Sequence, residues 1–370
     1  MKFTLAIFLI FISIKPSYAI LDFEDHAFPE LVTSARALAM GNAYINKVDD
    51  SWSAFYNPAG LGTVRKPQFH LANIHFEGSN GLLDALGDGP AYKFPQKYKD
   101  SFDLTTMRTA LAKDQGKLAH SRINLFPNFT VRGLTLGYFY SQRNRSIINK
   151  DTANLFEVAE RKDHGPVMAL NASLFGGILK LGVSGIYVIR KDLYKSFGPT
   201  APVVIANNDY RSGKSLQVTA GGRLTLPWAM LPTISTVLRN STDNDFESPN
   251  NANLPNGGLP KRIRQTMDVG FSLTPQLGKR SRLHLEVNWK DVHNAYETNA
   301  KRRTAAGVEL DFNRRIFLRG GYGDGWGSGG IGVRARTFQL DLTTYAVDRS
   351  LEDFRKEEDR RWVISFSSGF

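Results

Sequence analysis

The chain has 370 residues, of which 42% are hydrophobic and 22% charged, and its formal net charge is +12. This hydrophobic fraction is too high for a disordered chain. The absence of cysteine excludes disulfides, thiolate metal sites, thiol catalysis and the cysteine-linked anchor of bacterial lipoproteins. With 33 glycines and 24 phenylalanines, the composition favours strands and tight turns over a helical bundle.

The first 19 residues have the layout of a secretory signal peptide. Lys2 gives a positive start, and the apolar run from Phe3 to Ile14 is shorter than the about 20 residues that a membrane-spanning helix needs. Ser17 and Ala19 are small residues at a cleavage site. We therefore expect cleavage near Ala19. No later stretch is long and apolar enough for a spanning helix, which leaves a soluble periplasmic protein or an outer-membrane barrel.

Residues 20–66 precede the first predicted strand and are rich in small and apolar side chains. Within them, Asn57, Pro58, Ala59 and Gly60 form a quartet that favours a turn. A segment of this length can fold back into a barrel and close it, so we predict an N-terminal hatch. The alternative is a disordered or periplasm-facing lead-in, but such segments are rarely so rich in Ala, Leu, Met, Phe and Trp.

After residue 66, apolar and polar residues alternate in short runs, which is the period of a strand with one apolar face. Leu285 and Glu286 illustrate the alternation, as do Phe271 and Asp268. In a barrel, Leu285 and Phe271 should face lipid, and the two acidic residues should face the lumen. A soluble β-sandwich also alternates. The signal peptide, the aromatic residues near strand ends and the aromatic chain terminus favour the barrel.

The predicted architecture is all-β, a transmembrane antiparallel β-barrel of about 14 strands over residues 67–370. An even number of strands is usual in single-chain bacterial barrels. Short hairpins are predicted at residues 176–177, 313–314 and 336–337, and polar extracellular loops at 194–213, 241–261 and 348–359. The predicted strands are 68–77, 120–130, 132–142, 166–175, 178–192, 214–226, 232–240, 262–275, 281–291, 302–313, 315–323, 328–336, 337–347 and 360–370.

Residues 78–119 form the largest insertion between predicted strands. Leucines at helical spacing in 82–86 and 104–118 predict short helices there. The sequence leaves open whether these helices lie at the barrel mouth or inside the lumen.

The last predicted strand carries the features of a barrel-assembly signal. Trp362, Phe366 and Phe370 fall on its apolar face, and Phe370 ends the chain. We expect these side chains to meet lipid and to be recognised by the outer-membrane insertion machinery.

Motifs of enzymes and cofactor sites fail on their context. The run from Gly325 to Gly330 fits G-x-G-x-x-G, but a strand pattern follows it where a dinucleotide site needs a helix. Asp49 and Asp50 alone are weak evidence for a metal and fit a turn or a contact to the wall better. We expect no enzyme activity, no cofactor, no metal and no nucleic-acid partner.

Inward-facing charges allow two interpretations of the lumen. One is a solvated lumen with cross-strand ion pairs, and the other is an electropositive lumen that attracts carboxylates or phosphates. The candidate cations are Lys180, Arg190, Arg223, Lys290, Arg319, Arg334 and Arg336, and the candidate carboxylates are Asp268, Glu286, Glu309 and Asp341.

The run SARALAMGNAYINKVDDSWSAFYNPAGL resembles the N-terminal signature of the FadL/TodX outer-membrane transporters of hydrophobic compounds, and of their PorV-like barrel relatives. The C-terminal runs IFLRGGYGDGWGSGGIGVRARTFQLDLTTYAV and RRWVISFSSGF resemble the closing hairpins of those barrels. The resemblance implies a 14-strand barrel with a hatch that carries the motif Asn57-Pro58-Ala59. It implies passive passage of a hydrophobic or amphipathic, fatty-acid-like molecule. The alternatives are a PorV-like secretion-associated adaptor and a permanently plugged structural barrel.

Overall fold

The computed structural model describes most of the chain, and the predicted signal peptide and Phe370 lie outside the described residues. The described residues are 21, 31–87, 99–150, 154–249, 258–350 and 354–369.

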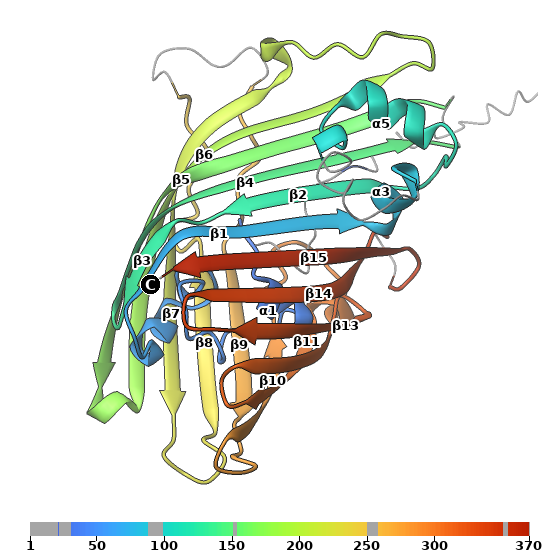
Figure 1. Ribbon diagram of the computed structural model, residues 1–370. Coiled ribbons are helices and arrows are strands. Elements are labelled where there is room, and N and C mark those ends of the chain that lie inside the picture. The colour runs from blue at the N-terminus through green and yellow to red at the C-terminus, as the bar shows by residue number, and fades with distance from the viewer. Residues whose placement is uncertain are drawn as a thin grey trace, which may run out of the picture.

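The described strands form one antiparallel sheet that closes on itself, because β1 pairs with β15 (Figure 1). Segments β2 and β3 both pair with β1 and with β4, so they are two parts of one strand that is interrupted at Phe126 and Pro127. The barrel therefore has 14 strand positions, which confirms the predicted architecture. The strands are β1 Gln68–Ser79, β2 Ala119–Leu125, β3 Asn128–Val131, β4 Leu134–Ile148, β5 Phe156–Leu174, β6 Leu179–Phe197, β7 Arg211–Thr225, β8 Thr233–Arg239, β9 Thr266–Leu273, β10 Ser281–Trp289, β11 Thr304–Phe312, β12 Ile316–Gly323, β13 Trp326–Arg334, β14 Phe338–Asp348 and β15 Glu358–Gly369.

Side chains alternate between the outer face of this sheet and the lumen. Phe271 and Leu285 are 47% and 41% exposed on the outside, whereas Asp268 and Glu286 are 3% and 2% exposed inside. The alternation predicted from the sequence is therefore confirmed for these residues. An apolar outer band on a closed barrel is the architecture of outer-membrane proteins, which indicates an outer-membrane location. Among the described residues, no helix is long and apolar enough to cross a membrane.

The connections differ strongly at the two ends of the barrel. One end carries only short turns, at residues 132–133, 175–178, 226–232, 274–280, 313–315 and 335–337, and we call it the short-turn end. In outer-membrane barrels the short turns face the periplasm. These six turns contain no Asp or Glu, and their basic residues are Arg132, Lys279, Arg280, Arg314, Arg315 and Arg336.

At the opposite, long-loop end, two short helices of the 78–119 insertion pack on the sheet. They are α3, Asn80–Ala85, and α5, Leu104–Leu111. Their side chains join Ile148, Phe156 and Val158 in one buried cluster. Ile148 pairs with Phe156 across the ladder and alternates with Ile147, which packs against Leu21 in a different cluster. The two helices therefore cover the face of the sheet opposite to that of Ile147.

The main hydrophobic core lies inside the barrel, around the N-terminal part of the chain. We call residues 31–64 the luminal segment. It contains α1, Ala35–Ala39, then α2, Ser53–Tyr56, and the 3-10 helix η1, Pro58–Thr63. Helix α1 contacts β12, β13 and β14, and η1 contacts β5, β6 and β7. The segment therefore bridges two distant stretches of the wall.

Candidate functional site

The predicted hatch quartet forms a buried turn at the start of η1. The side-chain Oδ1 of Asn57 accepts a hydrogen bond from the Ala59 backbone N–H at 3.0 Å, and its Nδ2 donates to the Ile45 carbonyl at 2.9 Å. Pro58 begins the helix, where a missing N–H costs nothing. All four residues of the quartet, Asn57 to Gly60, are buried. The sequence therefore placed a structured turn correctly, and its role in gating stays a prediction.

This turn fits into a notch of the wall made by two paired glycines, Gly182 on β6 and Gly221 on β7. A Cβ on Gly182 would lie 2.3 Å from the Pro58 carbonyl carbon, and one on Gly221 would lie 2.1 Å from Asn57 Oδ1. Both distances are too short for any side chain. Asn171 on β5 adds a hydrogen bond from its Nδ2 to the Ala59 carbonyl at 3.2 Å. We call this contact the glycine notch.

A second anchor holds the luminal segment to the opposite wall through Arg36 of α1. Its guanidinium donates two hydrogen bonds to Glu309 of β11, at 2.7 and 2.9 Å, and one to Asp49 at 2.6 Å. Burial tends to raise the pKa of Asp49, but the charge of Arg36 outweighs it and holds that pKa well below its usual range. For Asp50 burial prevails, and the charge of Asp49 adds to it, so its pKa is raised. The acidic pair thus serves the anchoring of Arg36.

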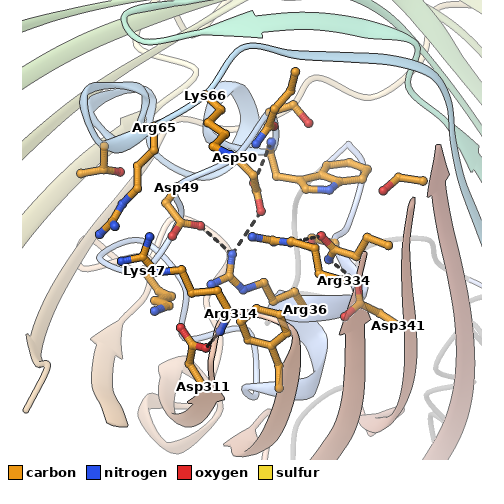
Figure 2. A pocket seen from close by; sticks show the side chains of 18 of the residues that line it. Arg36, Lys47, Asp49, Asp50, Arg65, Lys66, Asp311, Arg314, Arg334 and Asp341 are labelled. Carbon is orange, nitrogen blue, oxygen red and sulfur yellow. Dashed lines mark hydrogen bonds and ion pairs between the residues drawn. The ribbon is translucent and has the colours of Figure 1, made fainter. Parts of the chain in front are cut away.

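Between the luminal segment and the wall, a cavity of about 590 Å³ lies at the short-turn end (Figure 2). Its lining contains nine cationic residues and four carboxylates. The cations are Arg36, Lys47, Arg65, Lys66, Arg223, Arg282, Arg314, Arg334 and Arg336. The carboxylates are Asp49, Asp50, Asp311 and Asp341. Of the charged lumen residues expected from the sequence, the lining contains Arg223, Arg334, Arg336 and Asp341, whereas neither the hatch quartet nor the described residues of the assembly signal line the cavity.

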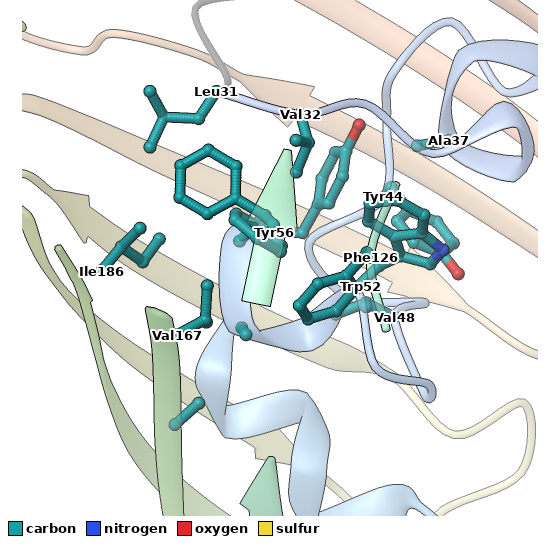
Figure 3. Close-up of a cluster of buried hydrophobic side chains, with 14 of the residues drawn as sticks. Leu31, Val32, Ala37, Tyr44, Val48, Trp52, Tyr56, Phe126, Val167 and Ile186 are labelled. Carbon is teal, nitrogen blue, oxygen red and sulfur yellow. The ribbon is translucent and has the colours of Figure 1, made fainter. Parts of the chain in front are cut away.

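Aromatic side chains fill the middle of the lumen, where the luminal segment meets β4–β6 (Figure 3). Phe55 packs edge-on against Phe126 and Phe139, with ring centroids 5.1 and 5.8 Å apart, and Trp52 lies 5.6 Å from Phe126. Phe126 faces inward at the interruption between β2 and β3, so the break in that strand supplies this apolar contact.

The inward charges of the central lumen are largely paired. Arg190 donates to Asp163 at 2.6 and 2.9 Å, and Arg319 donates to Glu309 at 2.8 Å and to Asp341 at 2.5 Å. These groups are buried, so the ion pairs expected from the sequence are present but are not solvated. The other expected cations differ in their surroundings. Lys180 donates to the Gly177 carbonyl, Arg223 to the Ile45 and Val48 carbonyls, Lys290 is buried, and Arg334 and Arg336 lie at the short-turn end.

A buried network around Glu77 crosses the seam where β1 meets β15. The Glu77 carboxylate lies 2.8 Å from His120 Nε2 and 3.2 Å from His75 Nε2, and it accepts a hydrogen bond from the Tyr345 hydroxyl at 2.6 Å. Arg361 donates to it at 3.4 Å. Four strands, β1, β2, β14 and β15, thus meet at one carboxylate. Sequence reasoning missed this site, and its only local signal was His75 and Glu77 two residues apart on one strand face.

The described residues of the predicted assembly signal face outward on β15. Trp362 and Phe366 are 50% and 41% exposed, and Trp362 Nε1 donates to Asn80 of α3 at 2.8 Å. Phe370 lies outside the described residues, so its position is untested. In the run from Gly325 to Gly330, Gly325 lies in a turn and the following residues belong to β13, so a strand and not a helix follows that turn.

No protein-family model matches this chain, and no curated protein does. Solved structures that it resembles include CdiB from Acinetobacter baumannii, at 10% identity over 83% of this chain and 60% of that chain, with a TM-score of 0.38. The Pseudomonas putida toluene transporter TodX is 11% identical over 91% and 98%, with a TM-score of 0.41. A Pseudomonas aeruginosa FadL homologue is 9% identical over 91% and 98%, with a TM-score of 0.30. The chain spans less than two thirds of the length of that CdiB. At these values the likenesses add nothing to the barrel architecture, which follows from the strand pairing itself.

Proposed function

We propose that this barrel lets a hydrophobic or amphipathic, fatty-acid-like small molecule pass through the outer membrane without an energy source. In this proposal the luminal segment is the hatch, and the turn of Asn57 to Gly60 in the glycine notch is the part that moves. No reaction chemistry and no cofactor is needed. The proposed partners are the surrounding lipid, the transported molecule and the outer-membrane insertion machinery.

The observation that carries this proposal is the way the luminal segment is attached. Among the described residues, none of residues 31–64 belongs to a strand. The attachment consists of the bonds of Arg36, the glycine notch and apolar packing. A segment held in this way can shift without breaking the ladder of the sheet, whereas a paired strand could not.

The apolar wall beneath the segment supports a hydrophobic or amphipathic solute. Phe139, Val167 and Ile186 face the lumen and pack against the segment. A shift of the segment would expose these apolar side chains to the lumen. The lumen of a porin for hydrophilic solutes, by contrast, is lined by polar side chains. Movement of the hatch would therefore favour a solute with an apolar part.

One specific observation supports a structural barrel with a permanent plug as the second candidate. The ion pair of Arg36 with Glu309 is buried, and separating it would leave buried charges unpaired at a cost of about 3–5 kcal/mol. The PorV-like adaptor remains a third possibility with no observation of its own in its favour.

Uptake by a Gram-negative host that expresses the protein tests the proposal. The protein should increase entry of radiolabelled octanoate over the empty vector. Changing Asn57 and Pro58 to Ala should alter this uptake without changing the amount of heat-modifiable folded barrel. Deleting residues 34–60 should admit small hydrophilic solutes such as a disaccharide, because the lumen is no longer filled.

Two results would contradict the proposal in different ways. If the wild-type protein does not raise octanoate uptake, the proposed passage of hydrophobic molecules is wrong, and a structural barrel with a permanent plug is the better explanation. If the deletion yields folded barrel that stays impermeable, the luminal segment is not the barrier.

A further inference from the structure

Five cationic side chains in the cavity at the short-turn end have no counter-charge bound to them. Within the described part of the chain, their side chains take part in no ion pair and no hydrogen bond. These residues are Arg65, Lys66, Arg282, Arg314 and Arg336.

The carboxylates of the cavity are already engaged elsewhere. Asp49 and Asp50 lie 2.6 and 3.3 Å from the Arg36 guanidinium, which also binds the wall. Asp341 lies 2.5 Å from Arg319, whose other partner is Glu309. These three acids are therefore held by Arg36 and Arg319, and none of them forms an ion pair with any of the five cations.

The fourth carboxylate, Asp311, lies among three guanidinium groups. Arg282 stands opposite it in the ladder, and the Arg314 backbone N–H donates to it at 2.6 Å. Burial, and then the charges of Arg314 and Arg282, lower the pKa of Arg65. One carboxylate does not balance three guanidinium groups, and like charges held close together in a partly enclosed space repel each other.

We propose that this cavity binds an oxyanion, a carboxylate or a phosphate, with Arg65, Arg282 and Arg314 as its principal contacts. Guanidinium groups suit this role because their N–H donors match the paired oxygens of both anions. The anion has two conceivable sources, a free periplasmic solute or the head group of an amphiphile. Leu231, which is 43% exposed, lines the same cavity and offers apolar surface to the chain of an amphiphile. Binding at this site does not depend on passage through the lumen.

Calorimetry on the purified full-length protein in a neutral detergent tests this site with three probes: inorganic phosphate, octanoate and uncharged octanol. The test variant is Arg282→Ala with Arg314→Ala. Its matched control is Arg280→Ala with Arg315→Ala, which removes the same charge within two residues of each test position, although neither residue lines the cavity. We expect affinity for the oxyanion to fall at least about tenfold in the test variant only, because charged hydrogen bonds are lost.

The outcomes separate the sources and also allow refutation. Binding of phosphate but not octanoate identifies a free anion, and stronger binding of octanoate than of phosphate identifies an amphiphile head group. Three results would overturn the proposal. The first is an equal affinity for the oxyanion in the two double variants, and the second is no binding of either oxyanion by the wild type. The third is equal binding of octanol and octanoate without any binding of phosphate. If the test variant does not fold, Arg65→Gln replaces it, because Arg65 lies outside every strand. This substitution must weaken binding of the oxyanion for the proposal to stand. Failure of octanoate uptake with intact oxyanion binding would reject only the transport function.

Discussion

Substituting Gly221 by alanine should dislodge the turn of the luminal segment. The new Cβ would lie 2.1 Å from Asn57 Oδ1, whereas ordinary contact begins at 3.4 Å, so the Asn57 side-chain oxygen must move by about 1.3 Å. A shift of this size breaks the two hydrogen bonds of the Asn57 side chain, at 2.9 and 3.0 Å. Overpacking of this kind costs typically about 1–3 kcal/mol, and here the cost should fall on the docking of the segment.

Gly222→Ala is the matched control for this substitution. A Cβ at Gly222 would meet Thr236 Cγ2 at 3.5 Å and Leu181 Cδ2 at 3.8 Å, which are ordinary contacts. Both substitutions remove one glycine from the same strand, so any change in backbone entropy is shared. A difference between them therefore reports the contact with Asn57 and not the loss of glycine.

The absence of cysteine makes the measurement simple. Ser53→Cys, at a fully buried position of α2, introduces a single thiol into the luminal segment with little change in size. Its labelling by a water-soluble thiol reagent measures how often the segment opens. Since each 1.4 kcal/mol is about tenfold, Gly221→Ala should raise the labelling rate roughly 5- to 150-fold over Gly222→Ala. Equal rates in the two backgrounds would refute the view that the glycine notch holds the turn.

Three further predictions concern other contacts. Arg36→Ala should also accelerate labelling at position 53, because it leaves Glu309 and Asp49 without their shared partner, and unchanged labelling would show that Arg36 is not an anchor. Glu77→Gln should lower the temperature at which the folded barrel converts to the unfolded band on a gel. The substitution weakens a charged network that joins four strands, and the loss of stability should be about 3–5 kcal/mol. An unfolding temperature equal to that of the wild type would count against a role of Glu77 in the seam. Deleting Phe370 should reduce the yield of heat-modifiable barrel, and a normal yield would mean that the end of the last strand carries no assembly signal.

The strand pattern was predictable because lipid imposes one apolar face on each strand within the membrane. The first half of β5 shows where that rule ends. The strand was predicted over 166–175 but begins at Phe156, and its early part contains Glu160, Arg161, Lys162 and Asp163. With 19 residues it is far longer than the about 10 that cross a bilayer, so its first part needs no lipid-facing apolar residues.

The candidate site was predictable only in part. The turn at Asn57 and Pro58 has a local sequence signal, and the structure contains that turn. The glycine notch depends on the pairing of Gly182 with Gly221, and the cavity collects residues from both ends of the sequence. The Glu77 network likewise requires the pairing of the first strand with the last. Such contacts follow from register between distant strands, which no local period reveals.

The attachment of the luminal segment to two distant parts of the wall has a consequence for the order of biogenesis. Its η1 contacts β5, β6 and β7, and its α1 contacts β12, β13 and β14, so it cannot complete its contacts until most strands have been added. The seam pairs β1 with β15, the first and the last strand of the sheet, so it needs both ends of the barrel sequence. The segment therefore completes its docking late in folding, and its apolar side chains stay uncovered until β12, β13 and β14 have joined the sheet.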